Sequence, residues 1–245
     1  MRKGSLLLLL ASFGLTFLLQ SCRNDEYLTT PPPVPNQSFS EEFDTVSSAL
    51  ARGWQLANTS VPLGGGVWQQ GGGIPPWFAP YSSSGTYAGF IGADYTSTSA
   101  DQGIISNWLI SPALTLQNGD KIVFYTKGWV LPASATDSTD YANRLQVCIN
   151  TTGTDVVIGK GLDAGNFNTV LLDINPNYIE YHTDPALYSP QAYPGSWTRF
   201  EATVFGLNGP TKGRFAFRYF VENGGYNGLA TGVAIDKVSY QSVSH

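Results

Sequence analysis

Apolar residues recur at every second position in eight short segments of the chain, and this alternation constrains its fold more than any other feature. A period of two is typical of β-strands with one buried face. The segments are Phe39–Phe43, Tyr87–Ile91, Ile104–Ile110, Ile122–Val130, Leu145–Ile149, Trp197–Phe205, Arg214–Val221 and Gly232–Tyr240. Turn residues such as Asn118-Gly119-Asp120 and Asn223-Gly224-Gly225 separate them. This punctuation favours tight antiparallel connections.

The alternation predicts an all-β fold, an antiparallel two-sheet jelly-roll β-sandwich, because two packed sheets limit the number of exposed strand edges. A barrel remains an alternative. Only 13% of the residues are charged, and 27 Gly and 15 Pro oppose long exposed helices. Helical character is confined to Ser47–Arg52 and to stretches within Asp173–Ala192. The segment Arg214–Val221 has aromatic residues on both faces, so we expect this strand to be buried on two sides.

The N-terminus has the pattern of an export signal, which we assign to residues 1–21. Arg2 and Lys3 precede an apolar run, Leu6–Leu19, that is too short for a membrane span. The tetrapeptide that ends in Cys22, Leu-Gln-Ser-Cys, resembles the bacterial lipobox. The resemblance implies cleavage before Cys22 and acylation of that cysteine, which anchors the protein in a membrane. The alternative is an ordinary secretory signal followed by a chance cysteine.

Residues 22–38 are expected to form a lipidated tether and proline-rich linker, followed by one β-sandwich domain over residues 39–245. The acidic stretch Arg23–Glu26 resembles the surface-export signal of lipoproteins in the Bacteroidota. A stiff proline-rich spacer, Thr29–Pro35, follows it. We therefore expect an outer-membrane lipoprotein exposed at the cell surface.

The body of the chain carries short motifs in a characteristic order. They are Phe39-Ser40-Glu41-Glu42-Phe43-Asp44, Gly53-Trp54, Asn107-Trp108-Leu109-Ile110-Ser111-Pro112, Gly195-Ser196-Trp197-Thr198, Phe215-Ala216-Phe217-Arg218-Tyr219 and Ala234-Ile235-Asp236-Lys237-Val238. Their order resembles that of choice-of-anchor J domains, which are related to cleaved-adhesin and MAM domains. This resemblance implies a surface β-sandwich used for adhesion or ligand binding, often with structural calcium.

Carboxylates at the two ends of the domain are candidate metal ligands. By alternation, Glu41 shares a face with two phenylalanines, and Asp236 shares one with Val238 and Tyr240. A buried charge needs a counter-charge or a metal. If the first and last strands are neighbours, Glu41 and Asp236 are expected to bind one structural Ca²⁺, with Asp44 as a weaker candidate ligand. The alternative is that these acids accept hydrogen bonds or pair with an arginine, namely Arg52, Arg214 or Arg218.

A glycine-rich segment, residues 63–81, contains the aromatic residues Trp68, Trp77, Phe78 and Tyr81. Rings exposed on a loop are a common way to bind a sugar face or a hydrophobic partner. We predict that these four residues contact a ligand. The alternative is that the rings fold back over one end of the core.

Composition and motifs argue against catalysis and against nucleic acid. The chain has 13 basic and 18 acidic residues, and Arg2 and Lys3 leave with the signal, so nucleic acid is an unsuitable partner. We find no Gly-x-Ser-x-Gly elbow and no paired-carboxylate motif of a jelly-roll glycosidase. The sequence thus predicts a non-catalytic surface domain that binds an extracellular protein or glycan. The alternative readings are a carbohydrate-binding module that uses residues 68–81 and, with less support, a glycosidase.

Overall fold

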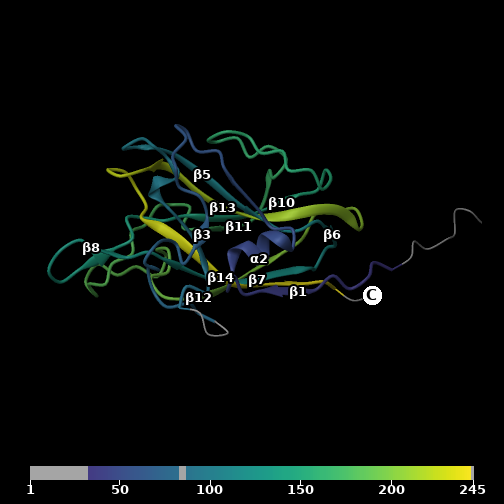
Figure 1. The fold of residues 1–245 in the computed structure, drawn as a ribbon, viewed down its shortest axis with the longest axis horizontal. Helices are drawn as coiled ribbons and strands as arrows, with labels where there is room; N and C mark the ends of the chain where they lie inside the picture. Colours follow the sequence, from purple (N-terminus) through teal and green to yellow (C-terminus); the bar gives the residue numbers. More distant parts are fainter. Residues whose placement is uncertain (1–32, 83–86, 244–245) are drawn as a thin grey trace, which may run out of the picture. The chain divides into compact units, whose positions relative to one another are not determined.

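The computed structural model describes residues 33–82 and 87–243. The signal peptide, Cys22 and most of the tether lie outside the described residues. The domain is almost entirely β-structure and consists of two antiparallel sheets packed face to face (Figure 1). The predicted all-β sandwich is therefore confirmed. None of the helices in the described ranges has both the length and the apolar character required to cross a membrane.

One sheet, here sheet A, has the strand order β12-β7-β14-β4-β3, with β1 paired to β14. The bounds of its strands are β1 Phe39–Glu41, β3 Gln69–Gln70, β4 Ile91–Asp94, β7 Lys121–Gly128, β12 Thr198–Thr203 and β14 Gly232–Gln241. Phe39 pairs with Tyr240, so the first and last strands are neighbours, as the calcium hypothesis required. The predicted segment Tyr87–Ile91 corresponds to β4, which begins only at Ile91.

The other sheet, sheet B, has the order β11-β10-β13-β5-β2, with β6 paired to β13. Its strands are β2 Gln55–Asn58, β5 Gly103–Ile110, β6 Leu114–Leu116, β10 Leu145–Asn150, β11 Thr169–Ile174 and β13 Thr211–Gly224. A small hairpin joins β8, Leu131–Pro132, to β9, Ser138–Thr139. The helical elements are α2, Val46–Ala51, and the 3-10 turn η3, Tyr95–Ser97.

The central strands of sheet B are buried on both faces, as the aromatic pattern of β13 predicted for that strand. Phe215 and Phe217 point into the main core between the sheets. Ala216, on the opposite face of β13, joins Trp108 and Phe167 in a second apolar cluster. Covering both faces explains why β10 is buried along its whole length.

The last strand changes face halfway along its length. Val233 and Ile235 belong to the core, and so do Val238 and Tyr240, although the two pairs have opposite parity. A β-bulge between Asp236 and Ser239 accounts for the change, with Lys237 at a φ of 48°. Asp236 therefore does not share a face with Val238 and Tyr240, which corrects the expectation from alternation.

Candidate functional site

Glu41 is buried and held by an arginine. Arg52 approaches it as a fork, with Nη2 2.7 Å from Oε1 and Nε 2.9 Å from Oε2. The backbone N–H of Phe43 also donates to Oε1. Because the guanidinium faces both carboxylate oxygens, this geometry does not fit a cation ligand. The structure corrects the assignment of Glu41 to calcium and matches the alternative, a pair with Arg52.

Asp236 holds a loop in place. Its Oδ2 accepts hydrogen bonds from the backbone N–H groups of Tyr81 and Ser82, at 2.8 and 3.0 Å, and its Oδ1 accepts one from Lys237. Burial raises the pKa of this carboxyl to about 7. Asp44 is half-buried before α2. Within the described ranges, no group of three or more His, Cys, Asp or Glu side chains is arranged to bind a metal, and calcium binding remains a prediction.

The aromatic residues predicted to contact ligand are not gathered in one place. Trp68 is 1% exposed and belongs to the main core, so it is corrected to a core residue. Phe78 stacks on Phe90 at 5.0 Å between ring centroids. Tyr81 is 43% exposed and stacks on Tyr125. Trp77 lines the cleft described below.

Trp77 is fixed between three glycines and a second tryptophan. A Cβ added at Gly72, Gly92 or Gly232 would lie 2.4 to 2.8 Å from its indole, so the ring rests flat on bare backbone. Trp129 stacks on the indole at 4.7 Å between ring centroids, with an interplanar angle of 3°. The absence of side chains at these glycines is therefore what allows the two rings to stack.

The cleft beside this pair has a volume of about 390 Å³ and is called here the Trp cleft. The residues that define it are Gln69, Ile74, Trp77, Asp94 and Trp129. Asp94 lies at the end of β4, and burial raises the pKa of its carboxyl. Its Oδ1 accepts a hydrogen bond from the backbone N–H of Thr96, 2.9 Å away. The cleft thus combines a rigid aromatic wall with a few polar groups, which is the usual composition of a small-ligand site.

Sequence reasoning missed Trp129, because we placed it inside the predicted strand Ile122–Val130. The strand β7 ends at Gly128, and Trp129 is the first residue beyond it. Its backbone N–H donates to the carbonyl of Gly232, 2.9 Å away. A tryptophan directly after a glycine at the end of a strand was the available signal.

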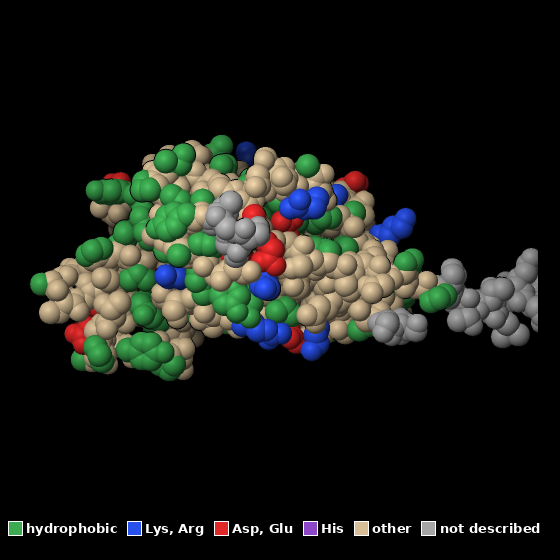
Figure 2. All heavy atoms as spheres, turned by 60° about the horizontal axis from the view of Figure 1, so that its bottom comes forward, with side chains coloured by type: hydrophobic (Ala, Val, Ile, Leu, Met, Phe, Trp, Pro, Cys, Tyr) green, Lys and Arg blue, Asp and Glu red, His purple; other side chains and the backbone are tan. Residues whose placement is uncertain are grey.

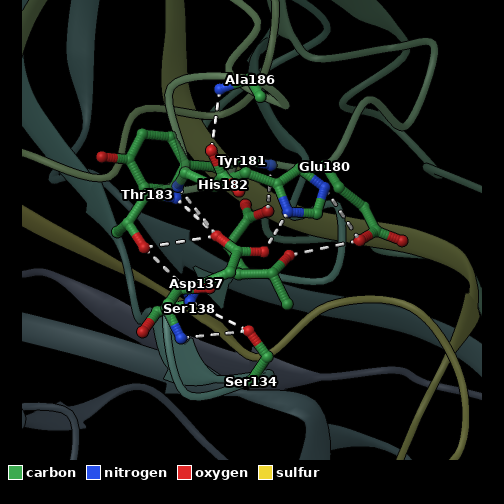
Figure 3. A network of polar contacts seen from close by, with 12 residues as sticks. Ser134, Asp137, Ser138, Glu180, Tyr181, His182, Thr183 and Ala186 are labelled. Atoms are coloured by element: carbon green, nitrogen blue, oxygen red, sulfur yellow. Dashed lines mark hydrogen bonds and ion pairs between the residues drawn. The ribbon is translucent and has the colours of Figure 1, made fainter.

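A polar network near the β8–β9 hairpin contains the histidine that a catalytic triad would need (Figure 3). His182 Nδ1 lies 2.7 Å from Asp137 Oδ2, and the backbone N–H groups of Thr183 and Asp184 donate to Oδ1. The hydrogen bond from His182 lowers the pKa of Asp137 to about 2. His182 Nε2 faces the carboxylate of Glu180 at 3.5 Å. The group beside His182 Nε2 is thus the carboxylate of Glu180, whereas a triad has a nucleophilic hydroxyl or thiol there. The contacts of Asp137 with His182, Thr183 and Asp184 join two loops.

Glycoside hydrolysis by the usual mechanisms needs two carboxylates across the scissile bond. Of the described residues that line the Trp cleft, Asp94 alone carries a carboxylate.

Comparison with solved structures identifies the fold. The K1 cleaved adhesin domain of Lys-gingipain from Porphyromonas gingivalis superposes with a TM-score of 0.50 and 21% identity, over 85% of this chain and 99% of that one. The K3 cleaved adhesin domain of the same protein gives 0.48 and 18%, over 85% and 100%. A carbohydrate-binding module in complex with β-1,4-galactotriose gives 0.38 and 8%, over 82% and 99%. No family model and no curated protein matches the chain. The chain thus has a cleaved-adhesin-like fold.

Proposed function

We propose that the protein is a lipid-anchored, non-catalytic binding domain of the cell surface, and that its Trp cleft captures carbohydrate. The observation that carries the proposal is the stacked pair Trp77 and Trp129 beside Asp94. A flat apolar wall suits the C–H face of a sugar ring, and a neighbouring carboxylate suits its hydroxyl groups. The anchor and the surface location rest on Cys22 and the acidic stretch that follows it.

The shape of the site favours a small or narrow ligand over a flat protein surface. The cleft volume of about 390 Å³ falls within the range of small-molecule sites. The aromatic wall is rigid, because Trp77 has glycine backbone on one side and Trp129 on the other. Little side-chain entropy is therefore lost when a ligand binds.

The test is retention of the purified full-length protein on a glycan array and on insoluble polysaccharides. We expect at least one glycan to be retained by the wild type and lost with Trp129→Ala. Asp94→Asn is a second variant, which keeps the shape of the cleft but removes its charge. The matched control is Tyr188→Ala, since Tyr188 is 57% exposed and does not line the cleft.

Melting temperatures separate binding from folding. Loss of retention by a variant that melts like the wild type supports the proposal. Retention that survives both Trp129→Ala and Asp94→Asn contradicts it. A folded wild type that binds no glycan also contradicts it, and extracellular protein adhesion becomes the leading function. Ile74, fully exposed on the rim of the cleft, is then the first residue to substitute.

A further inference from the structure

A second depression lies beside the Trp cleft, at the ends of β4 and β7. We call it the Tyr groove and define it by Tyr95, Leu131, Tyr141, Tyr226, Ala230 and Thr231. Its volume is about 480 Å³. The aromatic residues in it were not among those that the sequence analysis selected.

Two pairs of residues that are close in sequence connect the two depressions. Asp94 lines the Trp cleft and Tyr95 lines the Tyr groove. Just after the end of β7, Trp129 lines the Trp cleft and Leu131 lines the Tyr groove. The backbone joins these segments, because Tyr95 N–H donates to the carbonyl of Thr231 and the hydroxyl of Thr231 donates to that of Trp129. The cleft and the groove therefore lie side by side at one end of the sandwich.

The Tyr groove presents large rings to solvent. Tyr226 is 75% exposed and Tyr141 is 38% exposed. The ring of Tyr95 meets that of Tyr226 at 6.1 Å between centroids and an angle of 60°. In Figure 2, hydrophobic side chains gather mainly in the left half of the domain, which is the β8 end in Figure 1. Exposed rings in a concavity mark a binding surface more specifically than scattered apolar residues do.

The backbone around the groove is held in conformations that non-glycine residues rarely adopt. Tyr141, Ala142 and Ala230 have φ values of 49°, 66° and 72°. Such residues are strained and persist only where surrounding contacts fix them. Those contacts are present, since Ala230 N–H donates to the carbonyl of Tyr141 and Ala142 N–H donates to Asp140 Oδ1. The groove is thus shaped before any ligand arrives.

Further hydrogen bonds secure the segment that carries Tyr141. The backbone N–H of Tyr141 donates to Thr139 Oγ1, and this hydroxyl in turn donates to Glu180. Figure 3 shows this region together with the pair of Asp137 and His182. The network of Asp137, His182 and Glu180 therefore positions Tyr141, because it fixes the β8–β9 hairpin that leads into the groove.

We propose that the Trp cleft and the Tyr groove are two halves of one site, which binds a linear, uncharged oligosaccharide across both. This inference rests on the proposed function and names its ligand class. The lining residues of the groove carry no charge, and Asp94 is the charged residue of the cleft. A uronic acid or a sulfated sugar would find no cation there and would face a carboxylate. A neutral chain meets aromatic rings, hydroxyl groups and amides, and its own hydroxyl groups can donate to the carboxylate of Asp94.

The test is calorimetric titration of the full-length protein with β-1,4-linked gluco-, xylo-, manno- and galacto-oligosaccharides of two to eight units. For the wild type, we expect affinity to rise with chain length until both halves are filled. Tyr226→Ala is expected to weaken binding of the longest chains roughly tenfold and to leave binding of the disaccharide unchanged. Tyr188→Ala, the exposed control outside both depressions, is expected to bind every length like the wild type.

The other outcomes distinguish failure of this inference from failure of the proposed carbohydrate capture. Affinity that is independent of chain length, or equal in wild type and Tyr226→Ala, refutes the second half-site while leaving carbohydrate capture intact. Absence of binding to every chain by folded protein refutes both. Oligogalacturonates of the same lengths test the charge argument, and tighter binding of these acidic chains than of neutral ones overturns the assignment to uncharged glycans.

Discussion

The packing of Trp77 against Gly72, Gly92 and Gly232 leads to a prediction about stability that does not depend on any ligand. In Gly92→Ala, the new Cβ would lie 2.8 Å from Cζ3 of Trp77 and 2.9 Å from the Cα of Gly72. Ordinary carbon contacts begin at about 3.5 Å, so one partner has to move by more than half an ångström. Trp77 has no room to retreat, because Trp129 covers its other face.

Overpacking of this kind costs about 1–3 kcal/mol. For a domain of this size each kcal/mol lowers the melting temperature by about 2–4 °C, so we expect Gly92→Ala to melt about 2–12 °C below the wild type. The measurement is thermal unfolding of the full-length protein followed by circular dichroism. Gly65→Ala is the matched control, since a Cβ there has no neighbour within 4 Å.

A double substitution tests the cause of the loss. In a Trp129→Ala background the indole of Trp77 is free to move outward, so Gly92→Ala should destabilise the protein by less than it does alone. A coupling of about 0.5 kcal/mol or more is the signature of residues in contact. Equal melting of Gly92→Ala and Gly65→Ala, or strict additivity with Trp129→Ala, would refute the packing argument.

Three further predictions concern charge, metal and anchoring. The pKa of Asp137, lowered from 3.8 to about 2 by His182, means that its carboxylate stabilises the fold above pH 4 and loses this effect as the pH falls through 2. The gap in unfolding free energy between wild type and Asp137→Asn should therefore close over that range in urea titrations, and a constant gap would contradict the pairing. If a structural calcium ion is bound, a chelator should lower the melting temperature. Equal melting temperatures with and without chelator would reject the calcium prediction. Cys22→Ala should release the protein from the membrane fraction, whereas continued membrane association rules out lipidation at this residue.

Eight of the strands were predictable from sequence because their alternation directly reflects burial, whereas β2, β6 and β11 were not predicted. Phe215 and Phe217 pointed to one core, and the apolar opposite face of the same strand pointed to a second. The pairing of Glu41 with an arginine was also among the alternatives, since a carboxylate between two phenylalanines needs a positive partner. Such inferences need only the period of the strand and the cost of burying a charge.

Alternation failed where the backbone departs from a regular strand. The bulge at Lys237 reverses the face of Asp236, and a positive φ at a lysine leaves no mark in the sequence. Trp68 and Trp77 looked equivalent in a glycine-rich segment, yet one is in the core and the other lines a cleft. Whether each tryptophan is buried in the core or lines the cleft depends on which residues, distant in sequence, pack against it.

Tyr226 illustrates a signal that was present and not used. It lies in the run Gly224-Gly225-Tyr226-Asn227-Gly228, whose neighbours are all turn residues. Such a run has no apolar surface of its own on which a large ring can be buried, so an exposed ring could have been inferred from it. Aromatic residues placed singly within turns thus deserve the same weight as the denser aromatic segment at residues 63–81.

The two depressions lie far along β14 from the point where the chain enters the sandwich. The chain enters the sandwich at Phe39, which pairs with Tyr240 near one end of β14, whereas Gly232 at the other end supports Trp77. Eight residues of extended strand separate these points, about 25 Å. In Figure 1 β1 and the β8 hairpin accordingly lie toward opposite ends of the domain. On the anchoring proposed at Cys22, ligand capture and attachment would therefore use opposite ends of β14 and would not compete for the same surface.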